Sequence, residues 1–198
     1  NAYSGEITYW KHFDADYVAL THQNMNVDNA YFWRDGEGLL NLGVFDWGGM
    51  GAFSLGHKLW WWLYCGDHEL FRAHLSEYIA AFIASYAEHG GPVLDHDRLQ
   101  SMVIITALEQ MIGLIGAVPQ IMKMCPRKEW DTIKDRYDPR ISENIDGKST
   151  LRLYLHCMNS IIRILEEMQG DRVLEGWVQD AWVGGLGVEA KTDYVLGL

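Results

Sequence analysis

The spacing of apolar residues predicts that most of the chain after residue 56 is helical. Downstream of Asp67, apolar side chains recur every three or four residues, which is typical of a helix with one buried face. Asp67 is a suitable N-cap, and Gly90 with Gly91 is a suitable stop. The residues that form this periodic stripe are Leu70, Phe71, Leu75, Tyr78, Ile79, Phe82, Ile83 and Tyr86.

A second helix is predicted to begin after the cap Asp95 and to run to about Ala117, before Pro119. Residues 101–118 within it are almost continuously apolar and about long enough to cross a bilayer. However, Glu109 lies near the middle, where a membrane would make an ionisable group most costly. The segment is therefore interpreted as a buried helix, and no transmembrane segment is expected.

Two further helices are predicted nearer the C-terminus, over residues 151–168 and residues 171–183, with Gly184-Gly185 ending the second. Residues 126–150 between these helices and the preceding ones are polar and are predicted to form a long surface connection. The face expected to be buried on the first of the two helices carries Leu155, Met158, Ile162 and Leu165.

The N-terminal part of the chain has a different pattern. Residues 6–19 predict a helix or an irregular lead-in. Residues 30–33 and 39–45 are apolar runs separated by an Asp35-Gly36 turn signal with a further glycine, which predicts a β-hairpin. One hairpin beside four or more helices indicates an α+β, mainly α fold. We expect a single domain, with a loop and hairpin in residues 1–56 and a helical subdomain in residues 57–198.

Composition narrows the possible functions. The chain has 198 residues, of which 48% are hydrophobic and 22% charged, so it should fold as one domain. A net charge of -11 disfavours binding to nucleic acid or anionic lipid. Cys65, Cys125 and Cys157 lie far apart and lack metal-ligand spacing, so they are interpreted as reduced core residues in a reducing compartment.

The candidate chemistry lies in the sequence HQNMNVDN, residues 22–29, and in Asp46-Trp47-Gly48 after the second apolar run of the hairpin. Asn29 and Asp46 would offer oxygen ligands from opposite arms of the hairpin. That suits magnesium, which takes few protein ligands together with the oxygens of a bound phosphate. The alternative is that His22 and Asn29 only hydrogen-bond the loop backbone.

These two motifs resemble the C-terminal lobe of aminoglycoside phosphotransferases, choline kinases and ecdysteroid-kinase-like proteins, which share the protein-kinase fold. Those families read H-G-D-L-H-x-x-N or H-N-D-L-W-x-N-N, then a hairpin, then D-W or D-F-G. His22 and Asn29 match the ends of the first motif, Met25 replaces its Leu, and Asp46-Trp47-Gly48 matches the second. The resemblance implies that Asn29 and Asp46 hold the Mg ions of bound ATP, and that His22 supports the loop.

The same resemblance places Asn24 at the position of the catalytic Asp, which in kinases accepts or orients the proton of the acceptor hydroxyl. An amide can orient that hydroxyl but cannot take its proton. Asp28 is a poor substitute base, because neighbouring side chains in an extended loop point in different directions. Residues 52–59 also lack the Asp that these families carry after the metal motif. Only 21 residues precede His22, so the nucleotide-clamping N-terminal lobe is expected to be absent from this chain.

Two functions remain open. The first is a pseudokinase-like binding or structural subunit of a larger protein or assembly. The second is an ATP- and Mg-dependent phosphotransferase that acts on a small-molecule hydroxyl when the missing lobe is present. In either case we expect residues 22–31 and 47–53 to contact a partner, which is the N-terminal lobe or another protein subunit. A small-molecule acceptor could bind among the helices.

The remaining histidines and a tryptophan run have no assigned chemistry. His57, His68, His74, His89, His96 and His156 share no spacing with carboxylates, and surface or hydrogen-bonded core positions are expected for them. Trp60-Trp61-Trp62 cannot all face one side of a helix, because successive positions point about 100° apart. Either two are buried and one is at an edge, or they line a ligand site.

Overall fold

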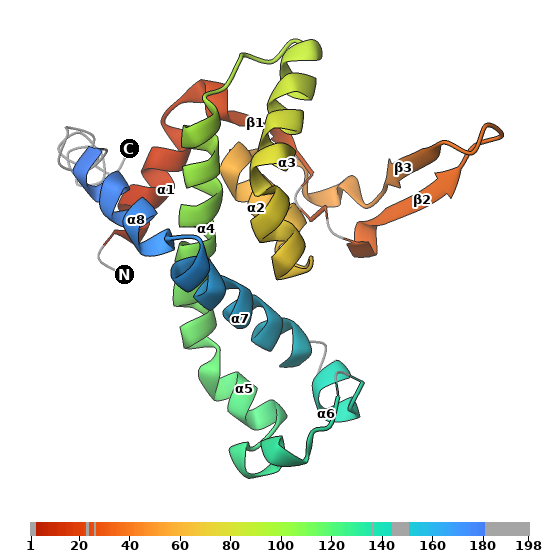
Figure 1. Cartoon of the computed structure of the whole chain (residues 1–198), viewed down its shortest axis with the longest axis vertical. Coiled ribbons are helices and arrows are strands. Elements are labelled where there is room, and N and C mark those ends of the chain that lie inside the picture. Colours follow the sequence, from red (N-terminus) through yellow and green to blue (C-terminus); the bar gives the residue numbers. More distant parts are fainter. Residues whose placement is uncertain (1–2, 23, 26, 136, 144–150, 181–198) are drawn as a thin grey trace.

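The fold is mainly helical with two small antiparallel sheets, which confirms the predicted α+β, mainly α class (Figure 1). The computed structural model describes residues 3–22, 24–25, 27–135, 137–143 and 151–180. Its helices are α1 Ser4–His12, α2 Leu55–Leu63, α3 His68–Glu88, α4 His96–Gly116, α5 Val118–Met124, α6 Pro139–Ser142, α7 Leu151–Glu167 and α8 Gly170–Trp177. Its strands are β1 Val18–Thr21, β2 Ala30–Arg34, β3 Leu40–Val44 and β4 Gly51–Ser54.

Helix α4 forms the centre of the core and contacts α1, α2, α3, α7 and α8 (Figure 1). Leu99, Met102, Val103 and Ile105 on this helix are completely buried. Among the described residues, α4 is the one helix whose length and hydropathy would suit a membrane crossing, a property that it shares with core helices of this kind. Its position among five other helices supports the interpretation as a core helix.

The predicted helix ends are confirmed in detail. The Asp67 carboxylate accepts hydrogen bonds from the backbone N–H groups of Glu69 and Leu70, and Asp95 caps α4 through the N–H of Arg98. Each cap satisfies donors that the first turn of a helix leaves unpaired. Gly90 ends α3 with a φ of +92°, a conformation that is easily reached without a side chain.

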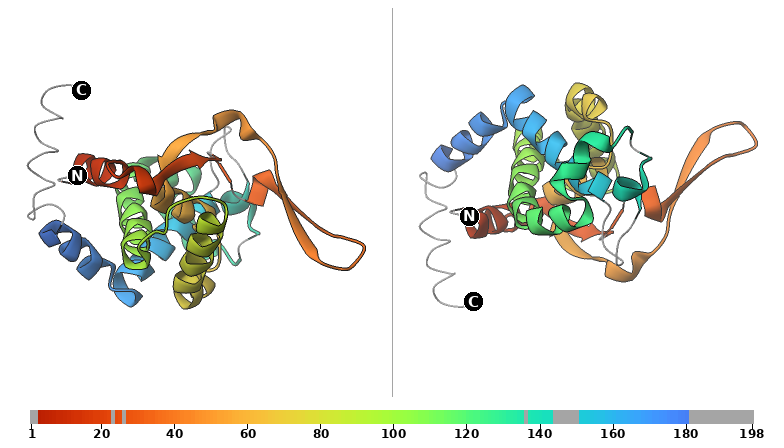
Figure 2. Two further views of the ribbon diagram at one scale, coloured as in Figure 1. Left: turned by 90° about the horizontal axis from the view of Figure 1, so that it is seen from above. Right: turned by 90° about the horizontal axis from the view of Figure 1, so that it is seen from below.

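The hairpin is confirmed, with β2 antiparallel to β3 in the register Ala30↔Val44 and Arg34↔Leu40. The sequence did not indicate a second sheet, in which β1 pairs antiparallel with β4 from Val18↔Ser54 to Thr21↔Gly51. The loop and hairpin therefore leave and rejoin the body through two paired strands. Figure 2 shows the hairpin extending away from the helical body in both views.

Several predicted boundaries and faces need correction. On α7 the buried side chains include Cys157, Ile161 and Ile164, whereas Ile162 and Leu165 of the predicted face are 44% and 37% exposed. Two apolar stripes lie side by side on this helix, and packing against α4 selects the other one.

The segment before α7 contains more helix than predicted. Helix α5, a 3-10 segment at Arg127–Thr132 and the short α6 precede α7, and with its N-terminus they enclose a second small core. Helix α8 is confirmed as far as Trp177, and the predicted stop at Gly184-Gly185 lies outside the described residues.

Candidate functional site

His22 joins the loop to the end of β3. Its ring is only 3% exposed. Nε2–H donates to the backbone oxygen of Phe45 at 2.8 Å, and Nδ1 accepts the backbone N–H of Asn24 at 3.2 Å. Because one partner is an acceptor and the other is a donor, the imidazole is neutral with its proton on Nε2. The ring thus connects Asn24 to the residue immediately before Asp46.

Asn29 closes the loop from its other end. Its side-chain N–H donates to the backbone oxygen of Asn24 at 2.7 Å, and its backbone carbonyl accepts the N–H of Phe45 at 3.1 Å. The residue is 8% exposed. Among the described residues, the side-chain oxygen of Asn29 has no hydrogen-bond donor. That oxygen is a ligand of the type that magnesium takes.

Asp46 has an unusual backbone for a residue other than glycine, with φ 61° and ψ 57°. Such a left-handed conformation costs about 1–2 kcal/mol and is tolerated best by Asn and Asp. Trp47 contributes to holding this turn, because its ring packs edge-on against His22 at 4.8 Å between centroids and its Nε1–H donates to the carbonyl of Val44 at 3.3 Å. The side chain of Asp46 is exposed and bends back towards Gly48.

Hydrogen bonds join three of the sequence-predicted residues, His22, Asn24 and Asn29, and Asp46 follows Phe45, to which both His22 and Asn29 bond. Asn29 pairs with Phe45 through the backbone, so Asn29 and Asp46 occupy neighbouring places on facing arms. His22 and Asn24 share a hydrogen bond beneath them. In the described part of the chain no cluster of three or more His, Cys, Asp or Glu could hold a metal on its own. A cation bound by Asn29 and Asp46 would need further oxygens, which phosphate supplies.

Trp61 is a part of the site that the sequence did not reveal. From α2, its Nε1–H donates to the side-chain oxygen of Asn24 at 3.2 Å. The contact joins residues 37 positions apart, so no local pattern could indicate it. A carboxylate at position 24 would accept the same hydrogen bond, and the local structure is therefore compatible with Asp as well as Asn.

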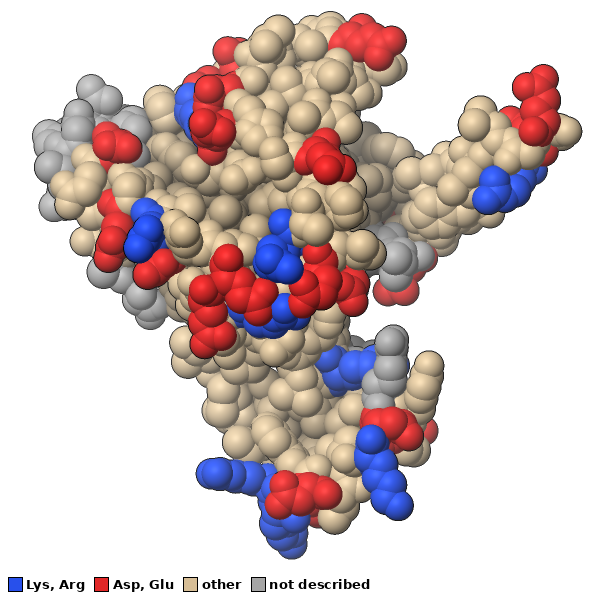
Figure 3. Space-filling model, viewed as in Figure 1, with Lys and Arg blue, Asp and Glu red and all other residues tan. Residues whose placement is uncertain are grey.

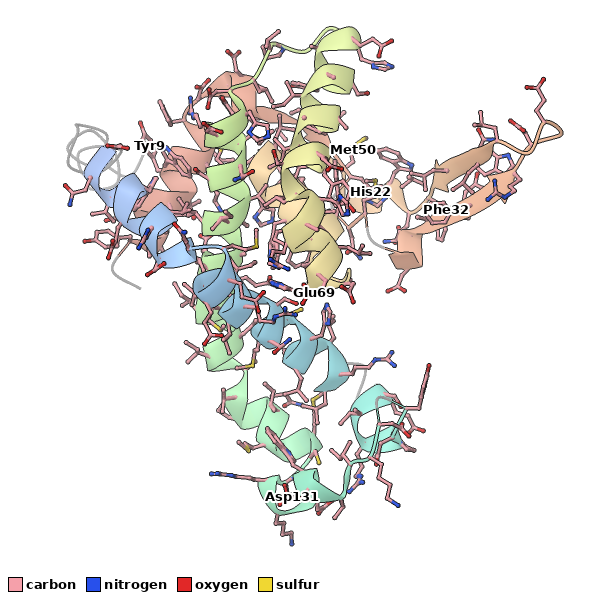
Figure 4. All side chains as sticks on the ribbon, in the orientation of Figure 1. Tyr9, His22, Phe32, Met50, Glu69 and Asp131 are labelled. Atoms are coloured by element: carbon pink, nitrogen blue, oxygen red, sulfur yellow. The ribbon has the colours of Figure 1, made fainter. Side chains whose placement is uncertain are left out.

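The surface beside the site is apolar. Figure 3 shows the hairpin with few charges along its length and a charged tip, and Figure 4 places His22 at its base and Phe32 on the hairpin itself. Each apolar side chain of this surface is exposed at 44% or more: Leu20, Tyr31, Phe32, Trp33, Leu39, Leu40, Leu42, Phe45, Trp47 and Met50.

Two histidines depart from the hydrogen-bonded core role that we expected. The ring nitrogens of His68 are buried without a hydrogen bond in the described chain, with Nε2 3.5 Å from a carboxylate oxygen of Glu167. Burial lowers the pKa of His57 to about 4, with smaller effects from Lys11 and Lys58, so this ring is neutral at pH 7.

Comparison with protein-family models, with curated proteins and with solved structures found no match to this chain.

Proposed function

We propose that this chain is a kinase-like C-terminal lobe, related to aminoglycoside phosphotransferases, that has no catalytic turnover by itself. It would act as a binding or structural part of a larger protein or assembly. The observation that carries this proposal is the double hydrogen bond of His22, which fixes the Asn24 loop to the strand end at Phe45 and Asp46. If His22 only stabilised the turn of its own loop, a hydrogen bond to the distant strand end at Phe45 would not be needed.

Asn29 and Asp46 are the residues that would hold Mg and, through it, the phosphates of ATP. Three features support this role: the side-chain oxygen of Asn29, to which no described residue donates, the exposed carboxylate of Asp46 and the left-handed backbone that presents it. A backbone in such a sparsely populated region is often found at functional sites. Bound Mg would neutralise phosphate charge, while these two residues orient the cation.

Asn24 is the reason for proposing that turnover is absent. Its amide oxygen already accepts a hydrogen bond from Trp61, and an amide cannot take a proton from an acceptor hydroxyl. The exposed apolar surface on the hairpin and around Trp47 supports the second part of the proposal. Exposed apolar patches beyond a few hundred Å² usually mark interaction sites. The partner would be the N-terminal lobe of the same protein or another subunit.

The second candidate is an active phosphotransferase formed when a nucleotide-clamping lobe is present. The presence of both proposed Mg ligands, Asn29 and Asp46, favours it. The two candidates therefore differ in whether Asn24 permits proton transfer.

We expect the isolated chain to transfer no phosphoryl group from Mg-ATP to aminoglycosides, choline or water above background. Loss of a general base alone typically slows a reaction by about 10²–10⁴-fold. The measurement is release of radiolabelled phosphate or formation of labelled product, with Asp46→Ala as the matched variant. Robust turnover that disappears in Asp46→Ala would contradict the proposal. In a form that includes a nucleotide-clamping lobe, Asn24→Asp should increase the rate.

A further inference from the structure

A pocket of about 490 Å³ lies among α1, β4, α2 and α4, and Trp61, which bonds to Asn24, is one of its lining residues. Its walls are largely aromatic. The rings of His57 and Trp61 are stacked, nearly parallel at 9° with 5.9 Å between centroids, and Trp60 and Phe53 line other parts of the wall. Stacked and facing rings favour a flat, apolar ligand body.

One part of the pocket wall is a buried ion pair with unused hydrogen-bonding capacity. The ammonium of Lys11, whose side chain is 3% exposed, bonds to the carboxylate of Glu109. Thr8 donates to the other carboxylate oxygen at 3.1 Å. An ammonium carries three donors, and within the described chain only one of those of Lys11 has a partner. Buried charges are stable only when such donors are satisfied, so this wall favours an acceptor.

Gln110 adds a further donor. Its side-chain oxygen accepts the Nε1–H of Trp60 at 2.6 Å, which fixes the orientation of the amide and leaves its NH₂ group unpaired among the described residues. The neutral ring of His57 offers one more N–H, again without a described partner. Lys58 lies nearby, with its ammonium 4.1 Å from the centre of the Phe53 ring. The groups of Lys11, Gln110 and His57 that lack a partner among the described residues are therefore mainly donors.

We propose that this pocket binds a small planar aromatic carboxylate, with its ring between the aromatic walls and its carboxylate directed towards Lys11, Gln110 and His57. This inference does not depend on the proposed function, because the pocket is separate from Asn29 and Asp46. It also does not require nucleotide. Trp61 connects the pocket to the loop, because it lines the pocket and donates to Asn24 through its indole N–H.

Gly113 provides a direct test. It lines the pocket on α4, and a Cβ built there meets no atom within 4 Å, so Gly113→Leu would fill the space without removing a polar group. Gly116 lies on the same helix outside the pocket, also with no atom within 4 Å, and Gly116→Leu is the matched control. Leucine favours helix over glycine at both positions. Circular dichroism would verify that both variants fold.

Isothermal titration calorimetry with 2-naphthoate, 2-naphthylmethanol and 2-naphthylmethylammonium keeps the ring constant while varying the charge. We expect 2-naphthoate to bind the unmodified chain and Gly116→Leu with equal affinity. It should bind Gly113→Leu about tenfold or more weakly, because the added side chain occupies space in the pocket. The ammonium compound should bind about tenfold more weakly than the carboxylate. Absence of 2-naphthoate binding, equal binding to Gly113→Leu, or tighter binding of the ammonium compound would overturn the proposal.

Discussion

Replacing Trp60 with alanine is expected to lower the free energy of unfolding by about 3–5 kcal/mol. Trp60 is 1% exposed, packs edge-on against Phe71 and donates to Gln110, so its removal leaves both a cavity and an unpaired amide oxygen. Urea unfolding followed by circular dichroism measures the change. Trp61 lies on the same helix, α2. Less stable packing of α2 should therefore also weaken the hydrogen bond between Trp61 and Asn24.

Trp33→Ala is the control for that experiment. Trp33 is 44% exposed on the hairpin, so its loss should cost about 0.5 kcal/mol or less in the isolated chain. Equal costs for the two substitutions would show that the helix does not pack as described. The contrast also separates the core, which stabilises this chain, from the apolar hairpin surface, whose proposed role is to contact a partner.

The second large effect is expected from Lys11→Met, which should lower the free energy of unfolding by about 3 kcal/mol. The substitution removes the cation and leaves the carboxylate of Glu109 in a mostly buried position, with Thr8 as its remaining donor. The double variant Lys11→Met with Glu109→Leu should recover most of the loss, since no uncompensated charge remains.

The same urea unfolding measurements on the two single variants and the double variant form a thermodynamic cycle. A coupling of more than about 1 kcal/mol is expected for residues in direct contact. Additive costs would mean that Lys11 and Glu109 do not interact.

Local signals were sufficient to predict the long helices α3, α4 and α7 and the hairpin. Asp67 and Asp95 indicate where helices begin, because each side chain accepts hydrogen bonds from backbone N–H groups in the first turn of the helix that follows. The hairpin turn is similarly local, since the carboxylate of Asp35 accepts the N–H groups of Glu37 and Leu39. Such contacts are between close neighbours in the sequence, and therefore leave a pattern that can be read.

Contacts between distant residues could not be predicted in this way. The β1–β4 pair is four residues long on each side, and its paired residues lie 30 to 36 positions apart, from Thr21↔Gly51 to Val18↔Ser54. The buried stripe of α7 depends on which neighbour it packs against. The Trp61–Asn24 hydrogen bond needs the complete tertiary fold. For the site, sequence patterns indicated the candidate residues His22, Asn24, Asn29 and Asp46. The hydrogen bonds that join His22, Asn24 and Asn29 could be found only in the structure.

The most direct test of the central claim is an Mn²⁺ titration in the presence of ATP, followed through the backbone amide NMR signals of the chain in solution, with Asp46→Ala and Asp28→Ala as matched variants. Asp28 is an exposed acid next to Asn29, so its removal changes the charge equally without removing a proposed ligand. We predict that signals of residues around Asn29 and Asp46 broaden first in the unmodified chain and in Asp28→Ala, and that Asp46→Ala abolishes this broadening. Broadening centred elsewhere, or unchanged in Asp46→Ala, would contradict a cation site formed by Asn29 and Asp46.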